Sequence, residues 1–126
     1  MTADSNVFRN WLPLRELSLV NFTRYGDFPA AYSFRDSISK ETLKYEHTKN
    51  MRNRIFKNYI SGVGGHGENS TTQRIYRYLF TDGWIERVEL AWLQTGDGAQ
   101  AEHKEKALRA AYKKRYGKLP PWDLID

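Results

Sequence analysis

Three side chains able to handle a phosphate group lie close together in the segment Ala30–Arg54. Tyr32 supplies a phenol, Lys44 an amine and Arg54 a guanidinium. The amine and the guanidinium are cations at neutral pH, and a guanidinium can donate two parallel hydrogen bonds to phosphate oxygens. Taken singly, Tyr32 also fits a half-buried strand aromatic and Lys44 a solvated strand residue. The set therefore predicts phosphate chemistry only where the fold brings its members together.

A carboxylate falls on the apolar side of a helix that we predict over Ala99–Tyr116. Glu105 follows Ala101 by four residues and precedes Leu108 by three, so the three side chains share one helix face. Burying an unpaired charge is costly. Either Glu105 lies at the edge of the core beside Arg109, which periodicity alone favours, or it faces a cavity that holds a cation.

The elements that must position these residues begin with a hairpin. Side chains alternate over Ala30–Arg35, which predicts a strand, and Glu41–Glu46 is its predicted return strand. Turn chemistry between them comes from Asp36, Ser37 and Ser39. A turn centred on residue 38 places Lys44 opposite Tyr32, and a slip of one residue places Tyr45 there instead.

A helix is predicted to follow the hairpin. Thr48 can cap it, and it runs to about Ile60 with Met51, Ile55 and Tyr59 as its inward stripe. Arg54 lies just beside that stripe. The glycine-rich stretch over residues 61–70 follows a helix, whereas a phosphate-binding loop normally follows a strand and opens a helix, so we interpret it as a flexible connector.

The remaining pattern predicts an α+β fold. Ser70 and Gln73 resemble a capping box before a short helix over Arg74–Phe80, and Trp84–Gln94 is apolar on both faces, as in a central strand. Leu17–Phe22 fits either an edge strand or a helical turn. We expect a small, mostly antiparallel central sheet of about three strands, with helices on both faces.

Length and composition fit one domain. The chain has 126 residues, enough for a single core, and we expect residues 1–7 to be frayed. There is no cysteine, so any metal must bind to oxygen or imidazole ligands. No secretory signal pattern and no membrane-spanning apolar run occurs in the sequence, which by default predicts a cytoplasmic protein without a membrane partner.

The net charge of +5 favours a polyanionic partner. No carboxylate lies between His47 and Gly67, and a second basic cluster lies near the end of the chain. Each cluster alone also fits a solvated helix face. The candidate nucleic-acid-binding residues are Lys49, Arg52, Lys57, Lys113 and Lys114.

The order of these residues resembles the GIY-YIG endonuclease family. The tripeptide ending at Tyr32 stands where the family has Gly-Ile-Tyr, and Lys44–Glu46 stands where it has Tyr-Ile-Gly, so both signature glycines are missing. The segment TKNMRNR, which ends at Arg54, resembles the part that carries the catalytic arginine, and EKALRAAY, which starts at Glu105, resembles the metal-binding motif. Pro121–Asp123 takes the place of the closing segment, where the family usually has asparagine. The resemblance spans about residues 28–123.

The resemblance implies hydrolysis of phosphodiester bonds with one divalent cation, Mg²⁺ or Mn²⁺, held by Glu105. Tyr32 would act as the general base, helped by a Lys44 ammonium that favours the phenolate, and Arg54 would stabilise charge on the phosphate. The implied catalytic residues are Tyr32, Lys44, Arg54 and Glu105, with Tyr45 in place of Lys44 if the register slips. His47 is a candidate assistant to the leaving group, although a lone histidine at a strand end also fits a plain surface residue.

Three readings of function remain open. The first is a metal-dependent endonuclease acting on DNA rather than RNA. The second is a catalytically degenerate domain of the same fold that binds nucleic acid or protein, which the missing glycines favour. The third is a purely structural interaction domain, which leaves the residue set unexplained. Because a nuclease core of this size normally borrows specificity from an added domain or from dimerisation, a homodimer is a further expected partner.

Overall fold

The computed structural model describes residues 7–16, 27–60 and 70–123. The described residues form a four-stranded antiparallel sheet in the order β1-β4-β2-β3. The strands are β1 (Leu12–Pro13), β2 (Ala30–Asp36), β3 (Thr42–Thr48) and β4 (Val88–Gln94). The α+β class is as expected, but the expected count of about three strands was wrong. The additional strand is β1, and its Pro13 is tolerated because an edge strand need not donate every amide hydrogen.

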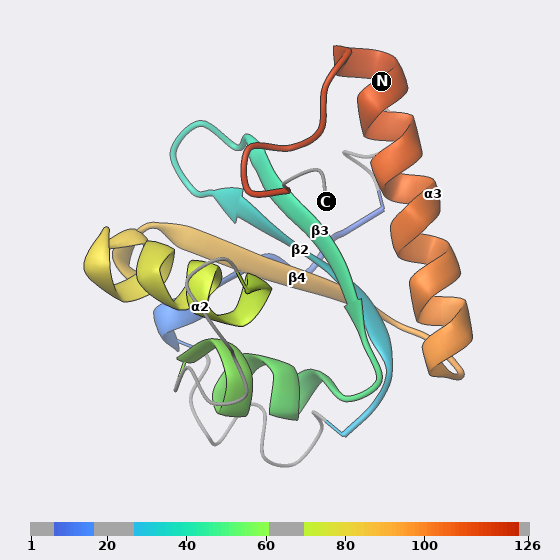
Figure 1. Cartoon of the computed structure of the whole chain (residues 1–126), viewed down its shortest axis with the longest axis horizontal. Coiled ribbons are helices and arrows are strands. Elements are labelled where there is room, and N and C mark those ends of the chain that lie inside the picture. Colours follow the sequence, from blue (N-terminus) through green and yellow to red (C-terminus); the bar gives the residue numbers. More distant parts are fainter. Residues whose placement is uncertain (1–6, 17–26, 61–69, 124–126) are drawn as a thin grey trace.

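Helices cover both faces of the sheet, as expected (Figure 1). Figure 1 shows α3 on one side, and α2 together with η3, drawn in green, on the other. The helical elements are η2 (Leu14–Glu16), η3 (Asn53–Ile60), α2 (Thr71–Tyr76), η4 (Arg77–Thr81), η5 (Trp84–Glu86) and α3 (Gly98–Tyr116). The core is correspondingly divided in two by the sheet. The larger part includes Tyr32, Phe34, Ile55 and Leu79, and the smaller part comprises Phe8, Tyr45, Ala91, Leu108 and Tyr112.

Strand β4 is central, as its two apolar faces predicted. Leu90 belongs to the larger core cluster and its neighbour Ala91 to the smaller one. The strand is shorter than predicted, because Trp84–Glu86 forms a 3-10 turn instead. Gly83, with φ of +79°, redirects the chain just before this turn, and the Trp84 ring then packs edge-on against Trp122 at 5.5 Å between centroids.

The β2–β3 hairpin is confirmed, but its register differs from both alternatives. Tyr32 lies opposite Glu46, and Phe34 lies opposite Lys44. The shift arises in the connection, where Lys40 adopts a left-handed conformation with φ of +64° and a bulge follows Phe34. The expected pairing of Tyr32 with Lys44 or Tyr45 is therefore wrong. Lys44 and Tyr32 still share a sheet face, because pairs two residues apart along a strand project to the same side.

Local cap signals account for the helix boundaries. The Asn50 side chain accepts a hydrogen bond from the Asn53 amide at 3.0 Å, so Asn50 caps η3 in place of the expected Thr48. Ser70 caps α2 as predicted, by accepting from the Gln73 amide. Helix α3 begins after the Asp97 cap and ends at Gly117, whose φ is +75°.

Some expectations fall outside the described residues: the frayed start over residues 1–6, the segment Leu17–Phe22 and the glycine-rich loop over residues 61–69. Val7, which we also expected to fray, packs against the smaller core cluster. Within the described part of the chain, no helix is both long and apolar enough to cross a membrane.

Candidate metal and phosphate site

Two carboxylates and one imidazole converge where the end of β3 meets α3. Glu46 and His47 are consecutive on β3, and Glu105 comes from the middle of α3. One ligand atom from each lies within 4.8 Å of the others. Within this cluster, His47 Nδ1 lies 3.1 Å from Glu105 Oε1. Because β3 is an edge strand, side chains from both of its faces can meet beyond its free edge.

Glu105 is buried, with 3% of its surface exposed. The predicted partner Arg109 is present, with Nη1 3.5 Å from Glu105 Oε2, but the expected surface location was wrong. Oε2 accepts no hydrogen bond from the described residues. Burial raises the pKa of Glu105, and the neighbouring Glu46 carboxylate raises it further. A cation placed here would relieve both effects.

The expected environment of Tyr32 was wrong. Tyr32 is fully buried, and its hydroxyl lies 2.7 Å from the Tyr59 hydroxyl. Burial, followed by the Tyr59 and Glu46 side chains, raises the pKa of Tyr32 well above its ordinary value. The phenol is therefore protonated at neutral pH. This is the opposite of the phenolate that a facing Lys44 ammonium was expected to favour.

Lys44 is held by two carboxylates instead. Its Nζ lies 2.7 Å from Asp123 Oδ1 and 3.1 Å from Glu46 Oε2, and the residue is 2% exposed. Asp123 also accepts a hydrogen bond from the Tyr45 amide at 3.3 Å. Although burial opposes the charged amine, the Glu46 and Asp123 carboxylates outweigh it and raise the pKa of Lys44. Lys44 is thus a buried cation whose ion pair with Asp123 joins the segment after α3 to β3.

Tyr45, the alternative partner of Tyr32, lies on the opposite sheet face. Its ring packs against Tyr112 of α3 at 6.1 Å and Phe8 at 6.2 Å. The structure therefore places Tyr45 in the smaller core cluster and away from the phenol of Tyr32.

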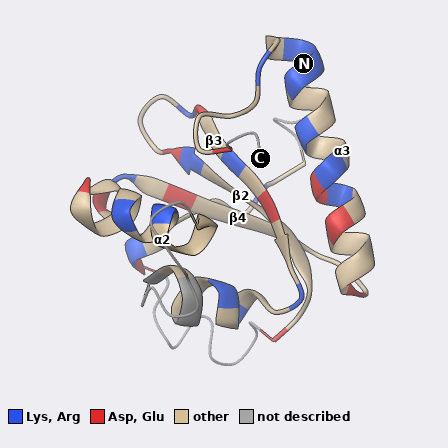
Figure 2. Cartoon of the chain, viewed as in Figure 1, with Lys and Arg blue, Asp and Glu red and all other residues tan. Residues whose placement is uncertain are grey.

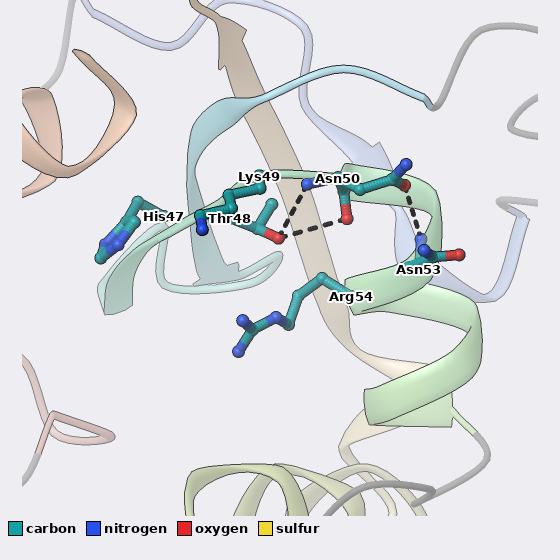
Figure 3. A pocket seen from close by; sticks show the side chains of 6 residues that line it. All are labelled: His47, Thr48, Lys49, Asn50, Asn53 and Arg54. Atoms are coloured by element: carbon teal, nitrogen blue, oxygen red, sulfur yellow. Dashed lines mark hydrogen bonds between the residues drawn. The ribbon is translucent and has the colours of Figure 1, made fainter. Parts of the chain in front are cut away.

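A surface pocket of about 260 Å³ opens beside the carboxylates. Figure 3 shows the Arg54 guanidinium extending from the helix toward the side of the pocket where His47 and the Lys49 amine lie. The pocket is lined by His47, Thr48, Lys49, Asn50, Asn53 and Arg54. Arg54 Nε is buried without a hydrogen-bond partner among the described residues. The pocket thus offers two cationic side chains, Lys49 and Arg54, to an anion.

The predicted basic residues do not gather in one place. Lys49 lines the pocket, and Arg52 forms an ion pair with Asp27 at 3.0 Å. The side chain of Lys57 lies outside the described part of the structure. Lys113 and Lys114 are exposed in the last turn of α3 (Figure 2), about 22 Å along the helix from the end that abuts Lys49. The two clusters can therefore contact only well-separated phosphates.

Sequence reasoning missed three members of the site. Glu46 follows Lys44 by two residues, and this spacing alone indicates a shared strand face. The sequence predicted Tyr59 as a core residue, but it did not predict the contact between the Tyr59 and Tyr32 hydroxyls. The role of Asp123 toward Lys44 had no local signal, because 79 residues separate the two.

The chain matches no family model, and it matches no curated protein and no solved structure. Of the residues expected to act together, Tyr32, Arg54 and Glu105 are connected through Glu46, whose charge affects the pKa of all three. The structure leaves Tyr45 outside this group.

Proposed function

We propose that this chain is a divalent-metal-dependent nuclease that hydrolyses phosphodiester bonds in DNA. The observation that carries the proposal is the position of His47, which belongs both to the carboxylate cluster and to the lining of the cationic pocket. A site for a cation and a site for an anion therefore adjoin. Phosphodiester hydrolysis needs both, because charge on the phosphate must be neutralised while a nucleophile attacks.

The cluster fits a divalent cation. Carboxylate oxygens are donors that both Mg²⁺ and Mn²⁺ accept, and Glu105 Oε2 is a buried acceptor without a hydrogen bond among the described residues. When bound, such an ion supplies Lewis-acid stabilisation of the phosphoryl oxygens. Glu105 is the residue that would hold it.

Arg54 and Lys49 would bind the scissile phosphate. The planar guanidinium suits two phosphate oxygens, and it lies over the Tyr59 ring, which helps to orient it. Lys49 is exposed and can move to meet the backbone, while the amides of Asn50 and Asn53 add polar contacts at the far end of the pocket. Lys113 and Lys114 would contact the duplex away from the cleavage point.

In our proposal, Tyr32 helps to position Arg54 through Tyr59 and does not contact the phosphate itself. Its hydroxyl contacts Tyr59, and the guanidinium carbon of Arg54 lies 5.9 Å from the centre of the Tyr59 ring. A buried, protonated phenol is poorly suited to accept a proton from water. We therefore assign Tyr32 a positioning role toward Arg54 in place of the general-base role that the family resemblance implies.

A second candidate function is binding of nucleic acid without cleavage. It is favoured by the burial of Tyr32 and by the commitment of Lys44 to Glu46 and Asp123. In that case the pocket and the basic residues would still bind DNA. Affinity would fall steeply with salt, because counterions are released when lysine and arginine meet phosphates.

Incubation with supercoiled plasmid and Mg²⁺ or Mn²⁺ separates the two functions. We expect nicking by the wild-type protein and at least a hundredfold loss in Glu105→Gln. The matched control is Glu102→Gln, which changes an exposed glutamate of the same helix and should cleave as the wild type does. Salt-sensitive binding without nicking supports the second function. If the protein neither binds nor nicks the plasmid, both proposed functions are wrong.

A further inference from the structure

We infer that Glu46, His47 and Glu105 together form a three-ligand site for a first-row transition-metal ion, Mn²⁺ or Zn²⁺, in place of a Mg²⁺ site that rests on Glu105 alone. The inference rests on the proposed function in taking the cation to lie at Glu105, and it specifies the complete ligand set and the class of ion. Its test measures metal binding and is independent of cleavage.

The spacing of the donor atoms fits one coordination sphere. Adjacent ligands at bond lengths near 2.1 Å lie about 3.0–3.4 Å apart in octahedral or tetrahedral geometry. His47 Nδ1 and Glu105 Oε1 are 3.1 Å apart. The full set spans no more than 4.8 Å, so small side-chain rotations are enough to bring all three atoms to one ion.

Burial provides a second, independent observation. Glu105 is 3% exposed, yet its Oε2 accepts no hydrogen bond from the described residues and has the Arg109 guanidinium only at 3.5 Å. A buried carboxylate oxygen is normally satisfied by a donor or a cation. Apart from the ion pair with Arg109, Oε2 has no donor among the described residues, so this buried carboxylate has capacity left for a cation in the cluster.

The ion pair of Glu46 with Lys44 leaves the second carboxylate oxygen of Glu46 available to such an ion. Lys44 contacts Glu46 through Oε2, and the other oxygen, Oε1, lies 3.4 Å from the His47 amide nitrogen. Glu46 can thus keep its ion pair with Lys44 while Oε1 turns to a metal. The two carboxylates would supply negative charge to the ion, with Lys44 and Arg109 remaining as their other cationic neighbours at 3.1 Å and 3.5 Å.

The imidazole determines which ion is preferred. Mg²⁺ favours oxygen ligands and retains its waters, whereas Mn²⁺ and especially Zn²⁺ accept an imidazole nitrogen. His47 is partly exposed and lines the pocket, so an ion bound to Nδ1 would lie at the boundary between the carboxylates and the phosphate-binding side chains. The site would then place the metal where an anion in the pocket can reach it.

Isothermal titration calorimetry with the metal ions alone tests this assignment. We expect the wild-type chain to bind Mn²⁺ and Zn²⁺ at least tenfold more tightly than Mg²⁺. His47→Ala and Glu46→Gln should each weaken Mn²⁺ binding at least tenfold. The matched control is His103→Ala, an exposed histidine of α3, which should bind as the wild type does.

If the Mn²⁺ dissociation constant of His47→Ala or of Glu46→Gln lies within twofold of that of His103→Ala, the three-ligand set is wrong. Equal affinity of the wild-type chain for Mg²⁺ and Mn²⁺ would also overturn it. Circular dichroism and His47→Gln guard against a folding defect, because His47→Gln keeps the side-chain bulk while losing the imidazole. Paramagnetic broadening of the His47 ring signals by Mn²⁺ gives a direct readout.

Metal binding at these residues without nicking would refute the proposed function and leave this inference intact. Mg²⁺-dependent nicking with unchanged Mn²⁺ binding in His47→Ala would do the reverse.

Discussion

The His47 imidazole on β3 and the Glu105 carboxylate on α3 face each other at 3.1 Å, although 58 positions separate them in the chain. This contact joins the sheet edge to the long helix at the point where the cationic pocket opens. Bound metal should therefore stabilise the packing of α3 on the sheet as well as supply charge.

Metal should raise the melting temperature of the wild-type chain and leave that of Glu105→Gln unchanged. A ligand that binds only the folded state adds about 2.7 kcal/mol at a concentration of 100 Kd. Differential scanning fluorimetry with increasing Mn²⁺ measures the effect. Glu102→Gln should keep the wild-type rise, and an equal rise in Glu105→Gln would place the ion elsewhere.

Replacing Tyr32 with phenylalanine should reduce cleavage less than tenfold. The variant loses the hydroxyl contact to Tyr59 but keeps the buried ring and the metal ligands. A general base contributes about 10²–10⁴-fold, so its removal would have a much larger effect and would alter the pH–rate profile. Single-turnover nicking rates over a range of pH decide between the two roles. A hundredfold loss would restore Tyr32 as the base.

Arg54→Lys should lower the cleavage rate at least tenfold while changing the overall fold little. Lysine keeps the charge, but it lacks the planar fork that can bind two phosphate oxygens and stabilise their developing charge. Plasmid nicking beside circular dichroism provides the measurement. Arg77→Lys, at an exposed position of η4, serves as the control and should retain wild-type activity. Full activity in Arg54→Lys would remove the guanidinium from the reaction.

Asp36 should make the fold sensitive to acid. Arg87 donates a hydrogen bond to Asp36 Oδ1 at 2.7 Å, and this bond holds the pKa of that carboxyl below its usual range. Because the folded-state pKa is depressed, the stabilisation is complete above the unfolded value of about 3.9 and is lost as the pH falls below it.

Asp36→Asn should therefore be less stable than the wild type at about pH 7, and the difference should shrink below about pH 4. The free energy of unfolding of both proteins, measured in urea across this pH range, tests the prediction. Asp82→Asn changes an exposed aspartate and should follow the wild-type curve. A difference that stays constant with pH would contradict the role assigned to the carboxylate.

Lys44→Met should destabilise the fold by about 3–5 kcal/mol, because Asp123 and Glu46 would lose a buried cationic partner. Equilibrium unfolding in urea gives the value. The exposed Lys104→Met should change stability by no more than about 0.5 kcal/mol. A similarly small effect of Lys44→Met would show that water satisfies both carboxylates.

Local signals in the sequence determined most of the secondary structure. The stripe through Ala101 and Leu108 together with Gly117 at the C-terminal end defined α3, and strict alternation defined β2. These features depend on neighbours within one or two turns or on strand alternation, so periodicity and cap chemistry are enough to predict them. The sequence also showed directly which side-chain types the candidate residues carry.

Only the tertiary structure decided which of those residues meet. The hairpin register placed Glu46 opposite Tyr32, because a residue in the left-handed region and a bulge shifted the pairing, and strand alternation cannot distinguish such shifts. The joining of Glu46 and His47 to Glu105, and of Lys44 to Asp123, depends on how α3 and the chain end pack on the sheet edge. Packing and ion pairing between distant segments act through space, so no local pattern in the sequence encodes them.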